Sequence, residues 1–258
     1  MNDFEQASQS GLHHVYETLS ALVNMAVRLD QEKDKKYNGS VQYISALSKS
    51  IIFFEYNSLE IFANFLGYMA VNLSNNSFSN GPLISQFLSQ NEMLFLSEKR
   101  HSSNQKILID DFQSTREKLK KNPRYFANMF AVPFSLDTTN QAWNKFISLE
   151  SSRNSLTHPK FNPHAIDLPA FKDSIFYFNA IVPIIPLAPH DLFDGIIAVR
   201  WYIREIFKLL SEIRSPHFFA LLQGVKIIDS FCYMTMVSLS SYCNIPESQI
   251  GSLFPRYQ

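Results

Sequence analysis

The chain has 258 residues, of which 46% are hydrophobic, so it can bury a sizeable core, and this excludes a disordered protein. Lysine plus arginine and aspartate plus glutamate number 23 each, so no net field attracts nucleic acid or an anionic membrane, and any RNA contact must come from a local patch. Only two cysteines occur, and the N-terminus lacks the basic and apolar regions of a secretory signal, so we expect a cytoplasmic protein.

Scarce glycine, long stretches without proline and few alternating strand patterns predict a single all-α domain over residues 1–258. Apolar residues recur at intervals of three and four over residues 13–30, which indicates a first amphipathic helix. A charged connection follows, and Ser40 is the expected N-cap of the next helix. Residues 41–74 contain no proline and only three charged residues, which predicts one long central helix or two nearly continuous ones.

The middle of the chain is predicted to be helical in part. We expect a helix beginning at Pro82, further helical segments as far as residue 121, and a loop-rich connector over residues 122–140. Thr138 or Thr139 is expected to cap the helix that follows.

Three more helices are predicted, over residues 141–157, 192–213 and 218–243. We interpret the apolar segments 51–73 and 227–243 as buried helices rather than membrane spans, because acidic residues interrupt the first and the second is short.

The helix predicted over residues 141–157 carries an arginine on its apolar face. The stripe spaced four, three, four and three residues apart consists of Ala142, Phe146, Leu149, Arg153 and Leu156. A buried guanidinium is costly unless it is paired or opens onto a cleft. The proline at position 159 disfavours helical geometry at His158, so the imidazole can turn back toward Arg153.

A polar stripe on the central helix offers a partner for this arginine. Asn57, Glu60 and Asn64 are spaced at i, i+3 and i+7 on an otherwise apolar helix. Buried polar groups are costly unless they are satisfied. We therefore hypothesise that Glu60 pairs with Arg153 and that Asn64 or Asn57 completes the network.

The six residues RNSLTH, 153–158, resemble the Arg-x4-His signature of HEPN domains. The resemblance implies a HEPN-like helical bundle with a core at about 41–213, an extra N-terminal helix at 13–30 and an additional C-terminal helix at 218–243. It also implies a homodimer whose two motifs face each other across a cleft. Such domains often act as metal-independent endoribonucleases in toxin–antitoxin and defence systems, so RNA and an antitoxin or regulatory protein are the implied partners, and no cofactor is implied.

RNA cleavage through the 2′-OH explains the residue types of the motif. A base must remove the hydroxyl proton, an acid must protonate the leaving oxygen, and a cation must stabilise the charged transition state. His158, with an ordinary pKa near ~6.5, can serve as base or acid. Arg153 would bind the phosphate and stabilise the transition state, and Asn154 would orient either the histidine or the phosphate. The product would be a 2′,3′-cyclic phosphate.

Two other interpretations stay open. In the first, the protein is a non-catalytic helical binding protein, in which Arg153 and Glu60 join two helices and His158 caps a helix C-terminus. In the second, His190 and Asp191 combine with an upstream histidine, His158 or His164, and with Asp229 in a metal-dependent HD-type phosphohydrolase. Asp191 is better suited to the first turn of a helix.

A basic segment forms the last candidate site. Lys118, Lys120, Lys121 and Arg124 are candidate RNA-binding cations beside two aromatic residues. The alternative, which we favour, is that these cations compensate a helix C-terminus before the Asn-Pro at 122–123.

Overall fold

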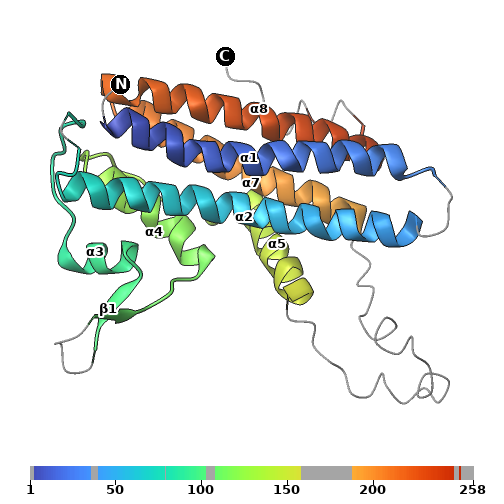
Figure 1. Ribbon diagram of the computed structural model, residues 1–258, viewed down its shortest axis with the longest axis horizontal. Coiled ribbons are helices and arrows are strands. Elements are labelled where there is room, and N and C mark those ends of the chain that lie inside the picture. The colour runs from blue at the N-terminus through green and yellow to red at the C-terminus, as the bar shows by residue number, and fades with distance from the viewer. Residues whose placement is uncertain are drawn as a thin grey trace.

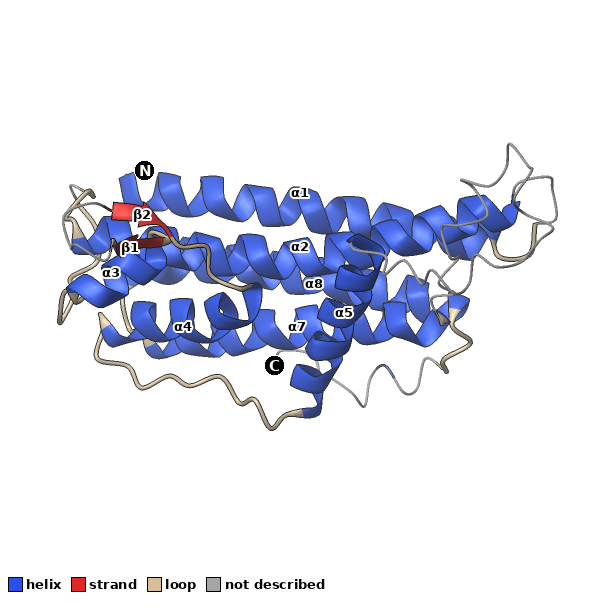
Figure 2. Cartoon of the chain, turned by 90° about the horizontal axis from the view of Figure 1, so that it is seen from below, coloured by secondary structure: helices blue, strands red, loops and turns tan. Residues whose placement is uncertain are grey.

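The computed structural model describes residues 3–35, 40–78, 80–102, 108–157, 188–246 and 250, and the fold is all-α (Figure 1). Its body is a bundle of four long helices: α1 (Asp3–Glu32), α2 (Ser40–Ser74), α7 (Pro189–Glu212) and α8 (Phe219–Tyr242). Helix α1 packs against α2 and α8, and α7 packs against the same two helices, so the four close around one core. Figure 2 shows the same bundle from below.

Side-chain contacts at two glycines show how tightly α1 is packed. A Cβ atom added to Gly11 would lie 2.1 Å from the ring of Phe65 on α2, and one added to Gly224 on α8 would lie 2.3 Å from the end of the Leu12 side chain. A larger residue at position 11 would displace a buried aromatic ring, whereas at position 224 the flexible end of Leu12 can move aside. The helices expected as additions to a smaller core, α1 and α8, thus form one side of the bundle and share its hydrophobic core.

The long helices follow from the sequence pattern. The buried residues of α1 recur every three or four positions from Phe4 to Leu29, so one face is apolar and the other is solvated. Helix α2 is one continuous helix, the first of the two predicted arrangements, although α1 begins ten residues earlier than residue 13. Helix α7 begins at Pro189, where the carboxylate of Asp191 accepts a hydrogen bond from the backbone of Ala188 at 3.1 Å.

The region between α2 and α5 differs from the prediction. Pro82 begins no helix; residues 81–89 are irregular, and a short helix α3 (Gln90–Leu96) follows, capped by Ser89. Two short strands, β1 (Lys99–His101) and β2 (Leu108–Asp110), then pair antiparallel with Arg100 opposite Ile109. Each strand is only three residues long, which is too short for an alternating pattern to be recognised in the sequence.

Helix α4 (Thr115–Asn128) also corrects a prediction, because it continues through Pro123 instead of ending at residue 121. A proline inside a helix removes one backbone hydrogen bond and costs about 3 kcal/mol. Here Pro123 is buried, and Phe126 and Ala127 beyond it continue the same buried face against the core. Burial of that face offsets the cost, so packing overrides the local preference.

Helix α5 (Gln141–Thr157) matches the predicted bounds, and its cap is Asn140 rather than a threonine: the Asn140 side chain accepts a hydrogen bond from the backbone of Ala142 at 2.9 Å. The Trp143 ring lies 6.4 Å from that of Trp201 on α7, and the Phe146 ring lies 6.4 Å from that of Tyr56 on α2. These aromatic contacts pack the first half of α5 against α7 and the middle of α2.

The segment Pro216–Tyr242, with 27 residues, is long and apolar enough by length and composition to cross a membrane. It joins a short 3-10 turn (Pro216–Phe218) to α8, and one face of α8 is buried against α1 and α7. A core helix passes the same test of length and composition, so this segment is weak evidence for a membrane span.

Candidate functional site

The predicted apolar stripe of α5 is present, and Arg153 lies at its edge. Ala142, Phe146 and Leu149 are buried as expected, whereas Arg153 and Leu156 are half-buried. The hydroxyl of Thr157 donates to the backbone carbonyl of Arg153 at 3.0 Å and so closes the last turn of the helix. Arg153 therefore sits where the core ends and the solvent begins.

The guanidinium of Arg153 is held by neutral groups. Its central carbon lies 5.0 Å from the centre of the Tyr56 ring, a cation–π distance, and Nη1 donates to Oδ1 of Asn154 at 3.1 Å. Its Nε atom is buried and has no hydrogen-bond partner among the described residues. Within that part of the chain, no acidic side chain forms an ion pair with Arg153. The Nε–H group of Arg153 is thus left without an acceptor in that part of the chain.

The pKa of Tyr56 is affected by burial and by nearby groups, including Arg153. Burial raises the pKa of Tyr56, and the carboxylates of Glu150 and Glu60 act in the same direction. Hydrogen bonding with Thr115 and the charge of Arg153 oppose this increase. The phenol therefore stays neutral at physiological pH and presents its ring to the guanidinium.

The ion pair predicted between Glu60 and Arg153 is not formed in the described part of the chain. Oε1 of Glu60 instead lies 3.5 Å from Nζ of Lys118 on α4. The physical reason is position: α4 packs along α2 at Glu60, whereas α5 reaches α2 about one turn earlier, at Tyr56. The sequence identified the acid correctly as a partly buried group, but it did not reveal which helix would supply the cation.

The other two residues of the predicted polar stripe, Asn57 and Asn64, do not bond to Arg153 in the described structure. Both are exposed, so they share the less buried face of α2 with Glu60. Asn64 lines a pocket formed with α4. Glu60 and Asn64 therefore lie where α2 meets α4, whereas Arg153 lies where α2 meets α5.

His158 lies outside the described residues, as does His164. The convergence of His158 with Arg153 stays a prediction, based on the proline that follows the histidine.

The basic segment lies in the first half and middle of α4, not at a helix C-terminus, and most of its cations are paired. Lys118 is buried between Glu98 at 2.8 Å and Glu60 at 3.5 Å. Lys120 and Lys121 pair with Glu117 at 2.6 and 2.9 Å, and their hydrogen bonds lower the pKa of that carboxyl. Of the four candidate RNA-binding cations, Arg124 is exposed, whereas each of the other three lies beside at least one acid.

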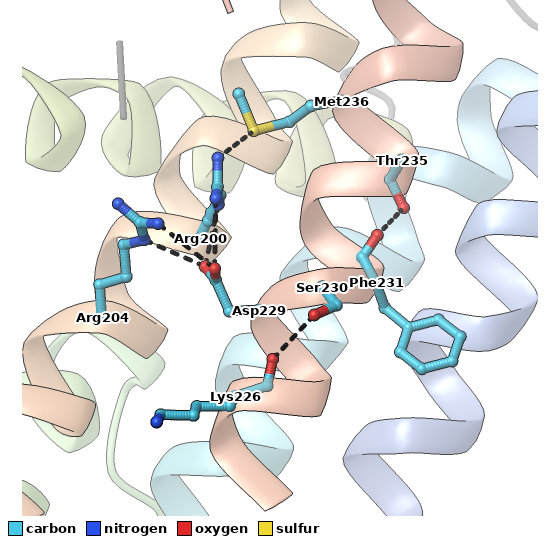
Figure 3. A network of polar contacts seen from close by, with 8 residues as sticks. All are labelled: Arg200, Arg204, Lys226, Asp229, Ser230, Phe231, Thr235 and Met236. Carbon is cyan, nitrogen blue, oxygen red and sulfur yellow. Dashed lines mark hydrogen bonds and ion pairs between the residues drawn. The ribbon is translucent and has the colours of Figure 1, made fainter. Parts of the chain in front are cut away.

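A second arginine cluster lies inside the bundle between α7 and α8 (Figure 3). Asp229 accepts from Nε and Nη2 of Arg200 at 2.9 and 3.2 Å, and from the same atoms of Arg204 at 3.2 and 3.4 Å. Arg200 also donates to the sulfur of Met236 at 3.8 Å and lies over the ring of Tyr233. This pairing was not predicted; the available signal was an aspartate inside the apolar segment that forms α8.

This cluster argues against the HD-type interpretation. Asp229 directs both carboxylate oxygens at arginines, and Asp191 caps α7 while His190 is exposed. Across the described ranges, no group of three or more histidine, cysteine or acidic side chains is placed to hold a metal ion. The interpretation of Asp191 as a first-turn acid is confirmed.

A third buried charge site was not anticipated. Glu55 on α2 is fully buried, and its two carboxylate oxygens have no side-chain partner in the described part of the chain. Burial raises the pKa of Glu55 well above 4.5, and the nearby Asp194 raises it further. Gly195 on α7 makes room for the group, because a Cβ atom there would lie 2.0 Å from Oε2. Burial therefore favours the protonated, uncharged form of Glu55.

Comparison of the chain with protein-family models, with curated proteins and with solved structures found no match. The function is therefore inferred from the residues of the site and their geometry.

Proposed function

We propose that the protein is a metal-independent endoribonuclease that uses Arg153 and His158. The observation that carries this proposal is the state of Arg153: a guanidinium at the edge of the core that has no acidic partner among the described residues. Retaining an uncompensated, half-buried cation is costly, and a phosphate that arrives as a ligand would compensate it.

Each residue near the motif has a role in this chemistry. Arg153 binds the scissile phosphate and stabilises the charge that develops on it. The Tyr56 ring and the Asn154 amide hold the guanidinium in place without neutralising it. His158 transfers protons to or from the ribose hydroxyl and the leaving oxygen. Since these groups supply the cation and the acid–base catalyst, the reaction needs no metal ion.

The cellular setting is part of the same proposal. We place the enzyme in the cytoplasm as a homodimer in which the motifs of two copies face each other. A toxin or defence role, controlled by an antitoxin or regulatory protein, fits an enzyme that cleaves RNA.

The decisive experiment is incubation of the purified protein with mixed RNA in EDTA. The variants are Arg153→Ala, Arg153→Lys and His158→Ala, with Arg214→Ala as the matched control, because Arg214 is an exposed arginine outside the site. We expect cleavage by the wild-type protein and the control, fragments ending in 2′,3′-cyclic phosphate, and a loss of at least about 100-fold in both alanine variants.

Arg153→Lys separates a point charge from a planar guanidinium. We expect partial recovery at most, because lysine cannot bind a phosphate through two parallel hydrogen bonds. Failure of a folded wild-type protein to cleave RNA would contradict the nuclease and support the non-catalytic binding protein. Cleavage that requires an added metal ion would support an HD-type enzyme instead.

A further inference from the structure

A pocket of about 300 Å³ lies between α2, α4 and the segment that follows α3. Its lining includes Asn64 and Tyr68 from α2, Lys118 and Asn122 from α4, and Leu96 at the end of α3. Asn64 lies eight residues beyond Tyr56 on the same helix, which corresponds to about 12 Å along its axis. The pocket is therefore separate from the guanidinium of Arg153.

The charges around this pocket disfavour an anion. Lys118 is 6% exposed, and Glu98 and Glu60 lie 2.8 and 3.5 Å from its ammonium group. The one cation of the lining, Lys118, is thus already paired with acids. A phosphate would find no unpaired cation among these lining residues, whereas a neutral ligand needs none.

The polar groups of the pocket require a ligand that donates hydrogen bonds. Asn122 is 4% exposed, and its Nδ2 donates to the backbone carbonyl of Ala63 at 2.9 Å. Its Oδ1 is buried and has no partner among the described residues. An unsatisfied buried acceptor costs about 1–3 kcal/mol, so a ligand N–H that reached it would bind favourably. The exposed Asn64 amide adds a donor and an acceptor at the same pocket.

The apolar groups of the pocket suit a flat ring. The Tyr68 side chain is 55% exposed, and Val71 and Leu96 add aliphatic surface. An exposed aromatic ring beside asparagine amides matches the two features of a nucleobase, an aromatic face and an edge of donors and acceptors. The volume lies at the small end of the range for ligand pockets, which fits a single base or nucleoside.

We propose that this pocket is a nucleobase-binding site, in which Tyr68 stacks on the base while Asn122 and Asn64 bind its edge. The site has no need of the cleavage chemistry. It can therefore be present whether or not Arg153 and His158 cut RNA.

Calorimetric titration of the full-length protein tests this inference. The probes are adenosine, guanosine, cytidine and uridine, a short single-stranded RNA in which every 2′-OH is methylated, and inorganic phosphate. We expect at least one nucleoside to bind with an affinity that excess inorganic phosphate does not lower, because phosphate is expected at Arg153 and not in this pocket. Tighter binding of the methylated RNA than of any nucleoside would identify the source of the base as RNA, and the reverse order would identify a free nucleoside.

Three variants locate the binding. Tyr68→Ala removes the stacking surface, and we expect about 10-fold weaker binding or more. Asn122→Leu replaces the amide by an apolar group of similar size, and we expect it to abolish nucleoside binding. Urea unfolding checks that this variant is folded, because the hydrogen bond to the Ala63 carbonyl is lost as well. Tyr16→Ala is the matched control, because Tyr16 lies on α1 against Phe231 and should bind as the wild type does.

The inference is overturned if no nucleoside binds, if inorganic phosphate displaces the bound nucleoside, or if Tyr68→Ala and Asn122→Leu bind as tightly as the control. Repeating the titration with His158→Ala keeps the two proposals separate. Loss of RNA cleavage with unchanged nucleoside affinity would support the pocket as independent of the catalytic motif, and loss of nucleoside affinity in that variant would contradict that independence.

Discussion

Arg200 and Arg153 differ in the groups that surround their guanidinium charges. Between α7 and α8, Arg200 and Arg204 converge on Asp229, and Arg200 is 2% exposed. At the end of α5, Arg153 is half-buried and is held by an aromatic ring and an amide. The comparison shows that the buried arginines with an acid join two helices, and we propose that Arg153, which has no acidic partner among the described residues, receives an anionic ligand.

The largest expected effect is on the paired site. Asp229→Asn removes the only carboxylate that Figure 3 shows between the two arginines and leaves both cations in the bundle. We expect the free energy of unfolding, measured with urea, to fall by about 3–5 kcal/mol. Asp110→Asn is the control, because its surface pair with Lys99 contributes about 0–1 kcal/mol. Equal losses in the two variants would show that the buried cluster has no special role.

Glu55 adds a third case to the comparison, because it is a buried acid whose carboxylate oxygens have no side-chain partner among the described residues. Its pKa is raised in the folded protein, so above about pH 4.5 the folded state holds a proton that the unfolded state releases. Unfolding free energy should therefore fall as pH rises, by up to about 1.4 kcal/mol per unit, until the folded pKa is reached.

Glu55→Gln keeps the shape of the side chain and removes this titration. We expect the variant to equal the wild type near pH 4 and to be more stable at pH 8, as measured by urea unfolding across that range. A wild-type protein whose stability rises between pH 5 and pH 8 in parallel with the variant would contradict a protonated Glu55.

Lys118 is intermediate between the fully buried and the exposed ion pairs, because its buried ammonium group lies between two half-exposed carboxylates. Lys118→Met should lower the free energy of unfolding by about 1–2 kcal/mol, because Glu60 and Glu98 are left facing each other with solvent as their only compensation. Combining the change with Glu98→Gln tests the coupling. We expect the double variant to recover part of the loss, and simple additivity would show that the pair is not coupled.

The smallest expected effect on stability is at Arg153. Arg153→Ala removes a cation–π contact and one hydrogen bond, and it also removes an unsatisfied Nε, so we expect a loss below about 1 kcal/mol. The same change should abolish RNA cleavage, as measured in EDTA. A loss above 3 kcal/mol would instead make Arg153 a structural residue comparable with Arg200.

Much of the fold could be predicted from local pattern. The central helix and α5 have the expected bounds because long apolar periodicity and a His-Pro break are properties of adjacent residues. The irregular segment after Pro82, the small hairpin and the passage of α4 through Pro123 were not predicted. In each case, contacts with distant residues outweighed or replaced the local preference.

In the candidate site, too, the local residue pattern could be predicted and the contacts between distant residues could not. The motif identified Arg153 and Asn154, and the polar stripe identified Glu60 and Asn64, because these residues break an apolar pattern. The partners could not be identified in this way: Lys118 for Glu60, Tyr56 for Arg153 and Asp229 for Arg200 are joined only when three separate helix contacts form.

The sequence by itself determined the all-α class, the long helices and the arginine on the apolar face of α5, because helical periodicity and residue chemistry are local. Only the tertiary structure decided which charges are neutralised. Pairing depends on which helices lie side by side and in what register, and the burial of apolar surface over the whole bundle sets that arrangement.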